Sequence, residues 1–226
     1  GWGVGDIREV VSKITDLPLD VVNTHGHPDH VSGDFQFPLI YLAEADLPVL
    51  EGCFTKENRR WALENVIKGP YPQGFSPESW MQGKLNQVST VNEHYEFNLG
   101  NKTIEVITIP GHSPGSIGLF DRKEGVLFSG DTVLQENIWM HLEESTPLST
   151  YLSSLKKLAS LSEKIQMILP AHGEIKLSPI IIDELINGVG DLLQGKRKGK
   201  PCHTFAGDGL LCTFNTCGII YNGDKF

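Results

Sequence analysis

The sequence has few cysteines, no long apolar run and a deficit of basic residues. Its 226 residues include four cysteines, none spaced as CxxC, which excludes a disulfide-built scaffold, so we expect reduced thiols. No apolar run approaches the roughly 18 residues of a membrane helix. No basic segment followed by an apolar stretch and a cleavage site is visible, so a signal peptide is either absent or already removed.

The charge balance is acidic. Lys and Arg number 19 against 28 Asp and Glu, a formal net charge of -9, which opposes binding to a phosphate backbone. With 39% hydrophobic and 21% charged residues, the composition is typical of a globular protein that folds in water. We expect a cytoplasmic protein that acts on a small molecule, without nucleic acid or membrane, and the oligomeric state stays open.

The pattern along the chain indicates an α/β protein. A single core can grow to roughly 250 residues, so we expect one domain over residues 1–226. Short apolar runs alternate with segments of helical spacing, which favours a layered α/β fold. We expect helices at 5–15, 44–68, 147–162 and 178–194, with Ser178 as N-cap and Pro179 in the first position of the last one, strands at 19–23, 38–42, 103–109, 116–120, 126–129 and 165–169, a hairpin at 209–222, and a loop at 69–83.

The chemistry is concentrated in four short segments, each just after an expected strand. The first reads Thr24-His25-Gly26-His27-Pro28-Asp29-His30. Three imidazoles and a carboxylate within six residues are hard to explain by packing. The first two histidines can face one metal, while a turn through Pro28 directs Asp29 and His30 toward a second, and Gly26 lets the backbone pass close to the ions.

The other three segments each offer one ligand on a tight turn. They are Pro110-Gly111-His112-Ser113-Pro114-Gly115-Ser116, Ser129-Gly130-Asp131-Thr132 and Leu169-Pro170-Ala171-His172-Gly173-Glu174. With the first segment they supply five histidines and two aspartates. This nitrogen and oxygen set suits zinc, and iron or manganese when supply favours them, so we expect two metal ions, most simply Zn²⁺.

The four segments, in this order, resemble the HxHxDH, distal His, bridging Asp and final His signature of the metallo-β-lactamase fold superfamily. The resemblance covers residues 1 to about 175. It implies a four-layered αββα sandwich with the metals at one edge between two sheets. It also implies a first metal on His25, His27 and His112, a second on Asp29, His30 and His172, and Asp131 as the bridge between them.

The N-terminus departs from the family pattern. Members usually begin with several β-strands and an aspartate-glycine turn before the helix that here starts near Gly5. The opening Gly1-Trp2-Gly3 resembles the end of that turn. We therefore expect an N-terminally incomplete domain in which part of one sheet is missing.

The resemblance implies a metal-dependent hydrolase. Between two metals roughly 3.5 to 4 Å apart, a bridging water loses a proton near neutral pH. The resulting hydroxide attacks an ester, thioester or lactone carbonyl. We expect Asp29 as the catalytic residue, which accepts a hydrogen bond from the hydroxide and helps return a proton to the leaving group.

Other activities of the same scaffold stay open. A phosphodiesterase uses the same ligands, a sulfur dioxygenase holds one iron, and a metal-binding module without activity is a third reading. Diiron oxygen-reducing members usually carry glutamate at the position of His27, and the commonest β-lactamases place cysteine at that of Asp131, so both are disfavoured. Glyoxalase II thioesterases add a helical glutathione domain, for which too few residues follow His172.

The remaining candidates have ordinary structural readings. His94, His141 and His203 lack a partner motif and are expected to be surface or core histidines. Lys196 to Lys200 is expected to be a solvated loop. An aromatic group either forms a wall over the metals or caps the core, and it consists of Trp61, Tyr71, Phe75 and Trp80.

Overall fold

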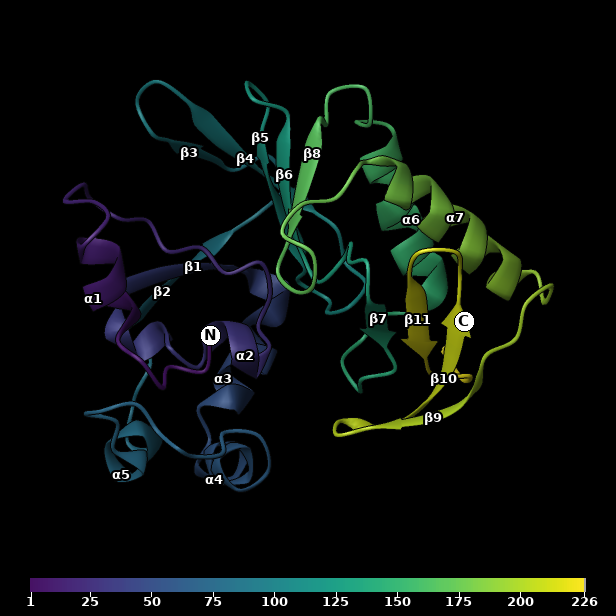
Figure 1. The fold of residues 1–226 in the computed structure, drawn as a ribbon. Helices are drawn as coiled ribbons and strands as arrows, with labels where there is room; N and C mark the ends of the chain where they lie inside the picture. The colour runs from purple at the N-terminus through teal and green to yellow at the C-terminus, as the bar shows by residue number, and fades with distance from the viewer. Residues whose placement is uncertain (226) are drawn as a thin grey trace. The chain divides into compact units, whose positions relative to one another are not determined.

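A computed structural model describes residues 1–225 and contains two compact units, Gly1–Val91 and Asn92–Phe226 (Figure 1). We call them unit 1 and unit 2. Both units combine helices with β-sheet, so the expected α/β class is confirmed. The single domain expected over residues 1–226 stays a prediction.

Unit 1 is mostly helical and contains a two-stranded parallel sheet. In the sheet, Leu39 of the first strand lies opposite Gln87 of the second. The elements are α1 (Ile7–Ser12), α2 (Pro28–Val31), η1 (Asp34–Gln36), β1 (Leu39–Ala43), η2 (Glu44–Asp46), α3 (Leu47–Cys53), α4 (Lys56–Asn65), α5 (Pro77–Met81) and β2 (Gln87–Val91).

The helices of unit 1 follow the sequence pattern more closely than its strands do. The helical segment expected at 44–68 is confirmed but is interrupted before α4, where Thr55 accepts a hydrogen bond from the Asn58 N–H at 3.2 Å. The loop expected at 69–83 is wrong in part, because Ser76 caps α5 within it. β2 was not expected, since most of its residues are not buried and so give no apolar run.

The strand expected at 19–23 is wrong except for one bridge. Val22 pairs with Tyr41 in an isolated parallel bridge. Leu19 is half exposed and Asp20 is exposed. The segment therefore lacks the burial that a strand inside a sheet requires, although it still delivers the chain to position 24 beside β1.

Two apolar clusters form the core of unit 1. In the first, Val31 of α2 packs with residues of β1 and α3. The second consists of Ala62, Ile67 and Trp80, with Phe75 packed against it. Trp80 and Phe75 therefore cap the core, which was one of the two roles considered for the aromatic group.

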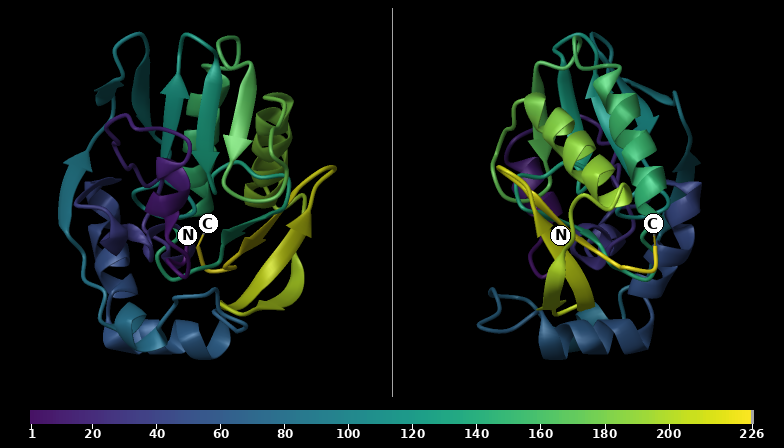
Figure 2. Two further views of the ribbon diagram at one scale, coloured as in Figure 1. Left: turned by 60° about the vertical axis from the view of Figure 1, so that its left-hand side comes forward. Right: turned by 90° about the vertical axis from the view of Figure 1, so that its right-hand side faces the viewer.

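Unit 2 contains two sheets and two long helices. The larger sheet has the order β3-β4-β5-β6-β8 and the smaller has the order β7-β11-β10-β9. The helices α6 and α7 lie side by side and pack on one face of the larger sheet (Figure 2). The elements are β3 (Glu96–Asn98), β4 (Thr103–Thr108), β5 (Ile117–Asp121), β6 (Val126–Gly130), β7 (Asn137–Met140), α6 (Leu148–Ala159), β8 (Met167–Pro170), α7 (Ile180–Leu193), β9 (Lys200–Thr204), β10 (Gly207–Thr213) and β11 (Gly218–Tyr221).

The expected elements of unit 2 are largely confirmed. The hairpin at 209–222 forms with Leu210 opposite Tyr221. The N-cap of α7 is Pro179 rather than Ser178, one residue later than expected. Lys200 is the first residue of β9 instead of part of a loop, because this polar strand is held by pairing with β10 rather than by an apolar run.

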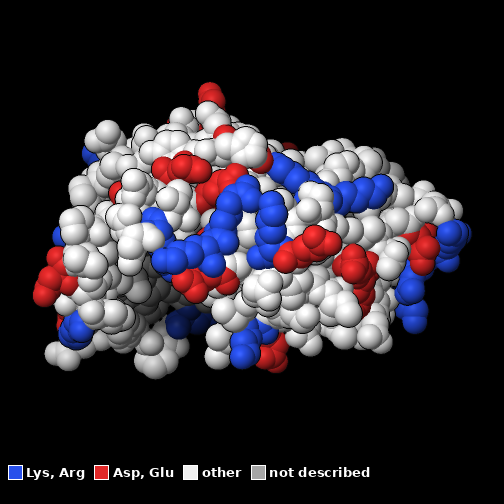
Figure 3. Space-filling view, turned by 90° about the horizontal axis from the view of Figure 1, so that it is seen from above, with Lys and Arg blue, Asp and Glu red and all other residues white. Residues whose placement is uncertain are grey.

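Opposite charges are interspersed on the face of the molecule seen from above, where Lys and Arg side chains alternate with Asp and Glu (Figure 3). Ion pairs of this kind in unit 2 include Lys102 with Asp121, at 2.6 Å, and Arg122 with Glu105. Across residues 1–225 no helix combines the length and the apolar content that a membrane crossing demands.

Candidate metal centre

Sheet topology brings three of the expected ligands together in unit 2. β5 is antiparallel to both β4 and β6, and β6 is parallel to β8. β4, β6 and β8 therefore point the same way, and their carboxyl ends meet at one edge of the sheet. His112 follows β4, Asp131 follows β6 and His172 follows β8. We call these three residues the unit 2 half-site.

The spacing in the unit 2 half-site fits metal ligands. Asp131 Oδ2 lies 3.5 Å from His112 Nε2 and also 3.5 Å from His172 Nε2. Two ligand atoms of one tetrahedral zinc, each bonded at about 2.1 Å, lie about 3.4 Å apart. The carboxylate thus stands at this separation from two imidazoles at once, which is what a carboxylate shared between two ions requires.

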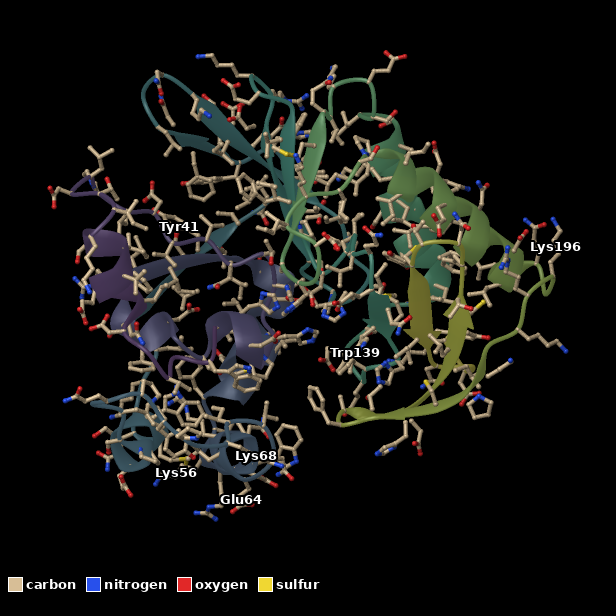
Figure 4. All side chains as sticks on the ribbon, viewed as in Figure 1. Tyr41, Lys56, Glu64, Lys68, Trp139 and Lys196 are labelled. Atoms are coloured by element: carbon tan, nitrogen blue, oxygen red, sulfur yellow. The ribbon has the colours of Figure 1, made fainter. Side chains whose placement is uncertain are left out.

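The ring of His112 is held with Nε2 toward Asp131. Its Nδ1 lies 2.6 Å from the backbone oxygen of Trp139, a residue of β7 labelled in Figure 4. A carbonyl only accepts, so Nδ1 carries the proton and donates it. In the neutral ring Nε2 then keeps its lone pair, the arrangement usual for a histidine that ligates a metal.

One face of α6 supports the turns of the unit 2 half-site. Three side chains at three-residue spacing donate to carbonyls beside these turns, namely Tyr151 to Thr132 at 2.7 Å, Ser154 to Pro110 at 2.6 Å and Lys157 to Thr108 at 2.8 Å. Burial raises the pKa of Tyr151 well above its usual value, so its hydroxyl stays protonated. A Cβ at Gly111 would lie 2.5 Å from the Tyr151 ring, so glycine permits this close approach.

The other four expected ligands lie together in unit 1. The ring centroid of His25 is 4.7 Å from that of His27 and 4.0 Å from that of His30. Asp29 Oδ2 is 3.3 Å from His30 Nε2, which again is close to the spacing of two ligands on one ion. His27 is the N-cap of α2 and Pro28 starts this helix, so the turn through Pro28 is confirmed. We call these four residues the unit 1 half-site.

Gly26 packs closely against the start of α3. Its N–H donates to Asp46 Oδ2 at 2.7 Å, and its carbonyl accepts from Cys53 Sγ at 3.3 Å. A Cβ at this position would meet the Asp46 oxygen and the Leu50 nitrogen at 3.0 Å. The glycine therefore lets the loop pack on the N-terminal end of α3, and the close approach is to this helix.

Asp46 is a supporting residue that the sequence reasoning missed. It is fully buried and stands at the N-cap position of α3, yet its side chain makes no capping hydrogen bond. The Asp-Leu-Pro sequence resembles an ordinary helix start. Only the fold reveals that the carboxylate is directed to the loop instead.

A buried pair of side chains brackets the unit 1 half-site. Asn23 Nδ2 donates to Asp34 Oδ2 at 2.7 Å, which joins the residues that precede and follow the loop and α2. Burial raises the pKa of Asp34 to about 7, although the hydrogen bond from Asn23 acts in the opposite direction. This pair fixes the two ends of the segment from which the ligands project.

The histidines outside the half-sites each have a local partner. His94 Nδ1 lies 2.8 Å from Glu105, and the other two contacts are His141 with Thr204 at 2.9 Å and His203 with Asp208 at 2.7 Å. These contacts agree with the expectation of ordinary histidines. The four cysteines are free thiols, as expected.

Several curated relatives of this chain are named as hydrolases. The chain is 29% identical over 168 residues to human acyl-coenzyme A thioesterase MBLAC2, which covers 73% of the chain and 60% of the relative. It is 27% identical over 178 residues to hydroxyacylglutathione hydrolase GloC of Haemophilus influenzae, covering 75% and 76%. The chain thus spans about 60% of the length of the human relative.

Solved structures share the fold. TTHA1623 in a di-iron-bound form superposes with a TM-score of 0.59 at 24% identity, covering 80% of this chain and 84% of that one. A metallo-beta-lactamase from Pontibacter korlensis gives 0.57 at 18% identity, covering 84% and 80%. The metallo-beta-lactamase superfamily model matches residues 17–172, more than half of the sequence. The chain therefore belongs to the metallo-beta-lactamase superfamily.

Proposed function

We propose that this chain is a dinuclear metal-dependent hydrolase whose substrates are thioesters. The observation that carries the proposal is Asp131, which stands 3.5 Å from the Nε2 atoms of both His112 and His172. The thioesterase and hydroxyacylglutathione hydrolase names of the relatives favour a thioester over a lactone or a simple ester.

The two half-sites together provide seven ligands. In the proposal His25, His27 and His112 hold the first metal, Asp29, His30 and His172 hold the second, and Asp131 is shared. When bound, the two zinc ions acidify a water and polarise the carbonyl of the substrate. The family model spans both segments of the chain, which supports a single shared centre.

Asp29 has the proton-transfer role. Its carboxylate is about one-third exposed and stays within 3.3 Å of His30 Nε2, so it is both held in place and open to the site. In the proposal one carboxylate oxygen binds the second metal and the other receives a proton from the attacking water. That proton is then returned to the sulfur of the leaving thiol.

The test combines metal analysis with a substrate screen. The chain, purified without added metal, is assayed on acetyl-coenzyme A, a lactone and an activated phosphodiester. We expect thioester hydrolysis to be fastest. Asp29→Asn, which keeps a ligand oxygen but cannot take up a proton, should lose most activity even when added zinc restores the metal content. Asp208→Asn, an exposed control, should change nothing. Faster phosphodiester hydrolysis, or oxygen uptake with one iron per chain, would overturn the proposal.

A further inference from the structure

Unit 1 contains a cavity of about 220 Å³ beside the histidine loop. Pro28, the first residue of α2, and Ser32, its C-cap, contribute to the wall of this cavity. The remaining wall comes from Trp2, Cys53, Asn58, Arg59, Trp61, Ala62 and Trp80. Aromatic and apolar groups thus dominate the lining, and one cation is among them.

Arg59 is the unusual member of this wall. It is 1% exposed, whereas the neighbouring charged residues of α4, including Lys56 and Glu64 labelled in Figure 4, are exposed. No carboxylate of residues 1–225 forms an ion pair with it. A buried charge without a counter-ion is strongly unfavourable, so its presence calls for an explanation.

The guanidinium is fixed in one orientation. Nη1 donates to the backbone oxygen of Trp80. The guanidinium carbon lies 4.4 Å from the ring centroid of Phe54 and 4.6 Å from that of Trp80. With the Phe35 ring at 5.7 Å, contacts with three aromatic rings and one carbonyl hold the planar group without neutralising it.

One edge of the guanidinium has no hydrogen-bond partner within residues 1–225. Nε and Nη2 are both buried and have no hydrogen-bond partner in the described chain. These two nitrogens present their N–H groups from the same edge, and such a pair can donate two parallel hydrogen bonds to the two oxygens of a carboxylate. We propose that this cavity is a binding site for a small-molecule carboxylate, which pairs with the Nε and Nη2 edge of Arg59.

A carboxylate suits the cavity better than a phosphate. One guanidinium balances one negative charge, whereas a phosphate dianion would keep an excess charge among aromatic groups. Burial lowers the pKa of Arg59 to about 10, so the cation persists at neutral pH. The volume holds a carboxylate with a short aliphatic chain, since about 30 Å³ accommodates one water.

The position of the cavity indicates a role for the bound carboxylate. Pro28 lies in the wall and directly precedes Asp29, so the cavity adjoins the segment that carries the unit 1 half-site. This last step rests on the proposed function: the carboxylate belongs to the substrate and lies at a distance from the thioester. Arg59 then acts as a specificity residue that touches substrate but takes no part in bond cleavage.

Tryptophan fluorescence offers a direct binding test. Three of the four tryptophans of the chain line the cavity. The chain is titrated with hexanoate, hexanol and inorganic phosphate, and hydrolysis of succinyl and butyryl thioesters of one neutral thiol is measured in parallel. The variants are Arg59→Lys, which keeps the charge and loses the fork, Arg59→Met, and Arg60→Met as an exposed control on the same helix.

We expect saturable quenching by hexanoate in the wild type and in Arg60→Met, at least tenfold weaker binding in Arg59→Lys, and none in Arg59→Met. The wild type and Arg60→Met should hydrolyse the succinyl thioester faster than the butyryl thioester, and this preference should disappear in Arg59→Lys. Equal binding of hexanol, tighter binding of phosphate, or hexanoate binding that survives in both Arg59 variants would overturn the inference. Hexanoate binding without any thioester hydrolysis would instead contradict the proposed function and leave the carboxylate site in place.

Discussion

The two half-sites are built in different ways. The unit 1 half-site takes its four ligands from residues 25–30, in a loop and the first turn of α2. The unit 2 half-site takes three ligands from positions between 112 and 172, after three separate strands. Local sequence alone concentrates the first group, whereas the second exists only when β4, β6 and β8 lie in the correct order.

The support of the half-sites differs accordingly. In unit 1, Asp46 accepts a hydrogen bond from the N–H of Gly26 and Cys53 donates one to the carbonyl of the same residue. In unit 2, α6 reaches several turns at once through Tyr151 and its neighbours. A variant of the unit 1 support should therefore disturb one loop, while a variant in α6 should disturb several turns at once.

The largest effect is expected for Asp131, the residue of the unit 2 half-site that is proposed to bind both ions. Asp131→Ala removes the oxygen that lies 3.5 Å from both imidazoles, so both metals should be lost and affinity should fall by more than the ~100-fold typical of an outer-shell change. Elemental analysis after dialysis measures this. Retention of one tightly held ion would show that the carboxylate is not shared.

The next effect tests the local support of unit 1. Asp46→Ala leaves the buried Gly26 N–H without its partner, and we expect metal affinity to fall by about 10- to 100-fold. Competition with a chelator of known affinity measures the change, with the exposed Asp20→Ala as control. Unchanged affinity would mean that the loop is held without Asp46.

A stability effect of intermediate size is expected in α6. Tyr151→Phe removes the hydrogen bond to the Thr132 carbonyl and leaves a buried acceptor unsatisfied, which should cost about 1 to 3 kcal/mol. Urea unfolding of the metal-free chain measures it, with Ser153→Ala on the same helix as control. If metal affinity falls while the free energy of unfolding stays the same, the contrast between the two kinds of support is wrong.

The smallest effect concerns a carboxylate of unit 2 that is outside the half-site. Glu184 Oε1 accepts from the Asn215 and Thr216 N–H groups at 2.7 and 2.6 Å. Burial raises its pKa, but these hydrogen bonds outweigh burial and the net pKa is lowered. Because the folded pKa is below the unfolded one, the stabilisation is present above the unfolded pKa and is lost as the pH falls through the folded value.

Glu184→Gln should therefore destabilise the chain by about 1 kcal/mol at pH 7. The difference from wild type should shrink as the pH falls below the usual glutamate pKa. Thermal unfolding of both proteins measures this difference. The pH range is about 3 to 7, from roughly one unit below the pKa of a free glutamate to neutrality. Metal content should not change, and a difference that grows toward low pH would contradict the assignment.

The sequence was sufficient for the strands that precede three of the proposed ligands. The motifs are short, and β4, β6 and β8 each contain apolar residues of which at least one is buried. It was insufficient for Asp46, Tyr151 and Arg59, because each side chain owes its role to a segment distant in the sequence. The polar strand β9 was missed for the same reason, since pairing with β10 holds it.

We proposed above that the two half-sites bind the same pair of ions. The most direct measurement is zinc per chain in the wild type, His27→Ala, His112→Ala and the double variant. We predict about two ions in the wild type and about one in each of the three variants, since both histidines are proposed to hold the same ion. A double variant with no zinc, beside single variants that each keep one, would contradict it.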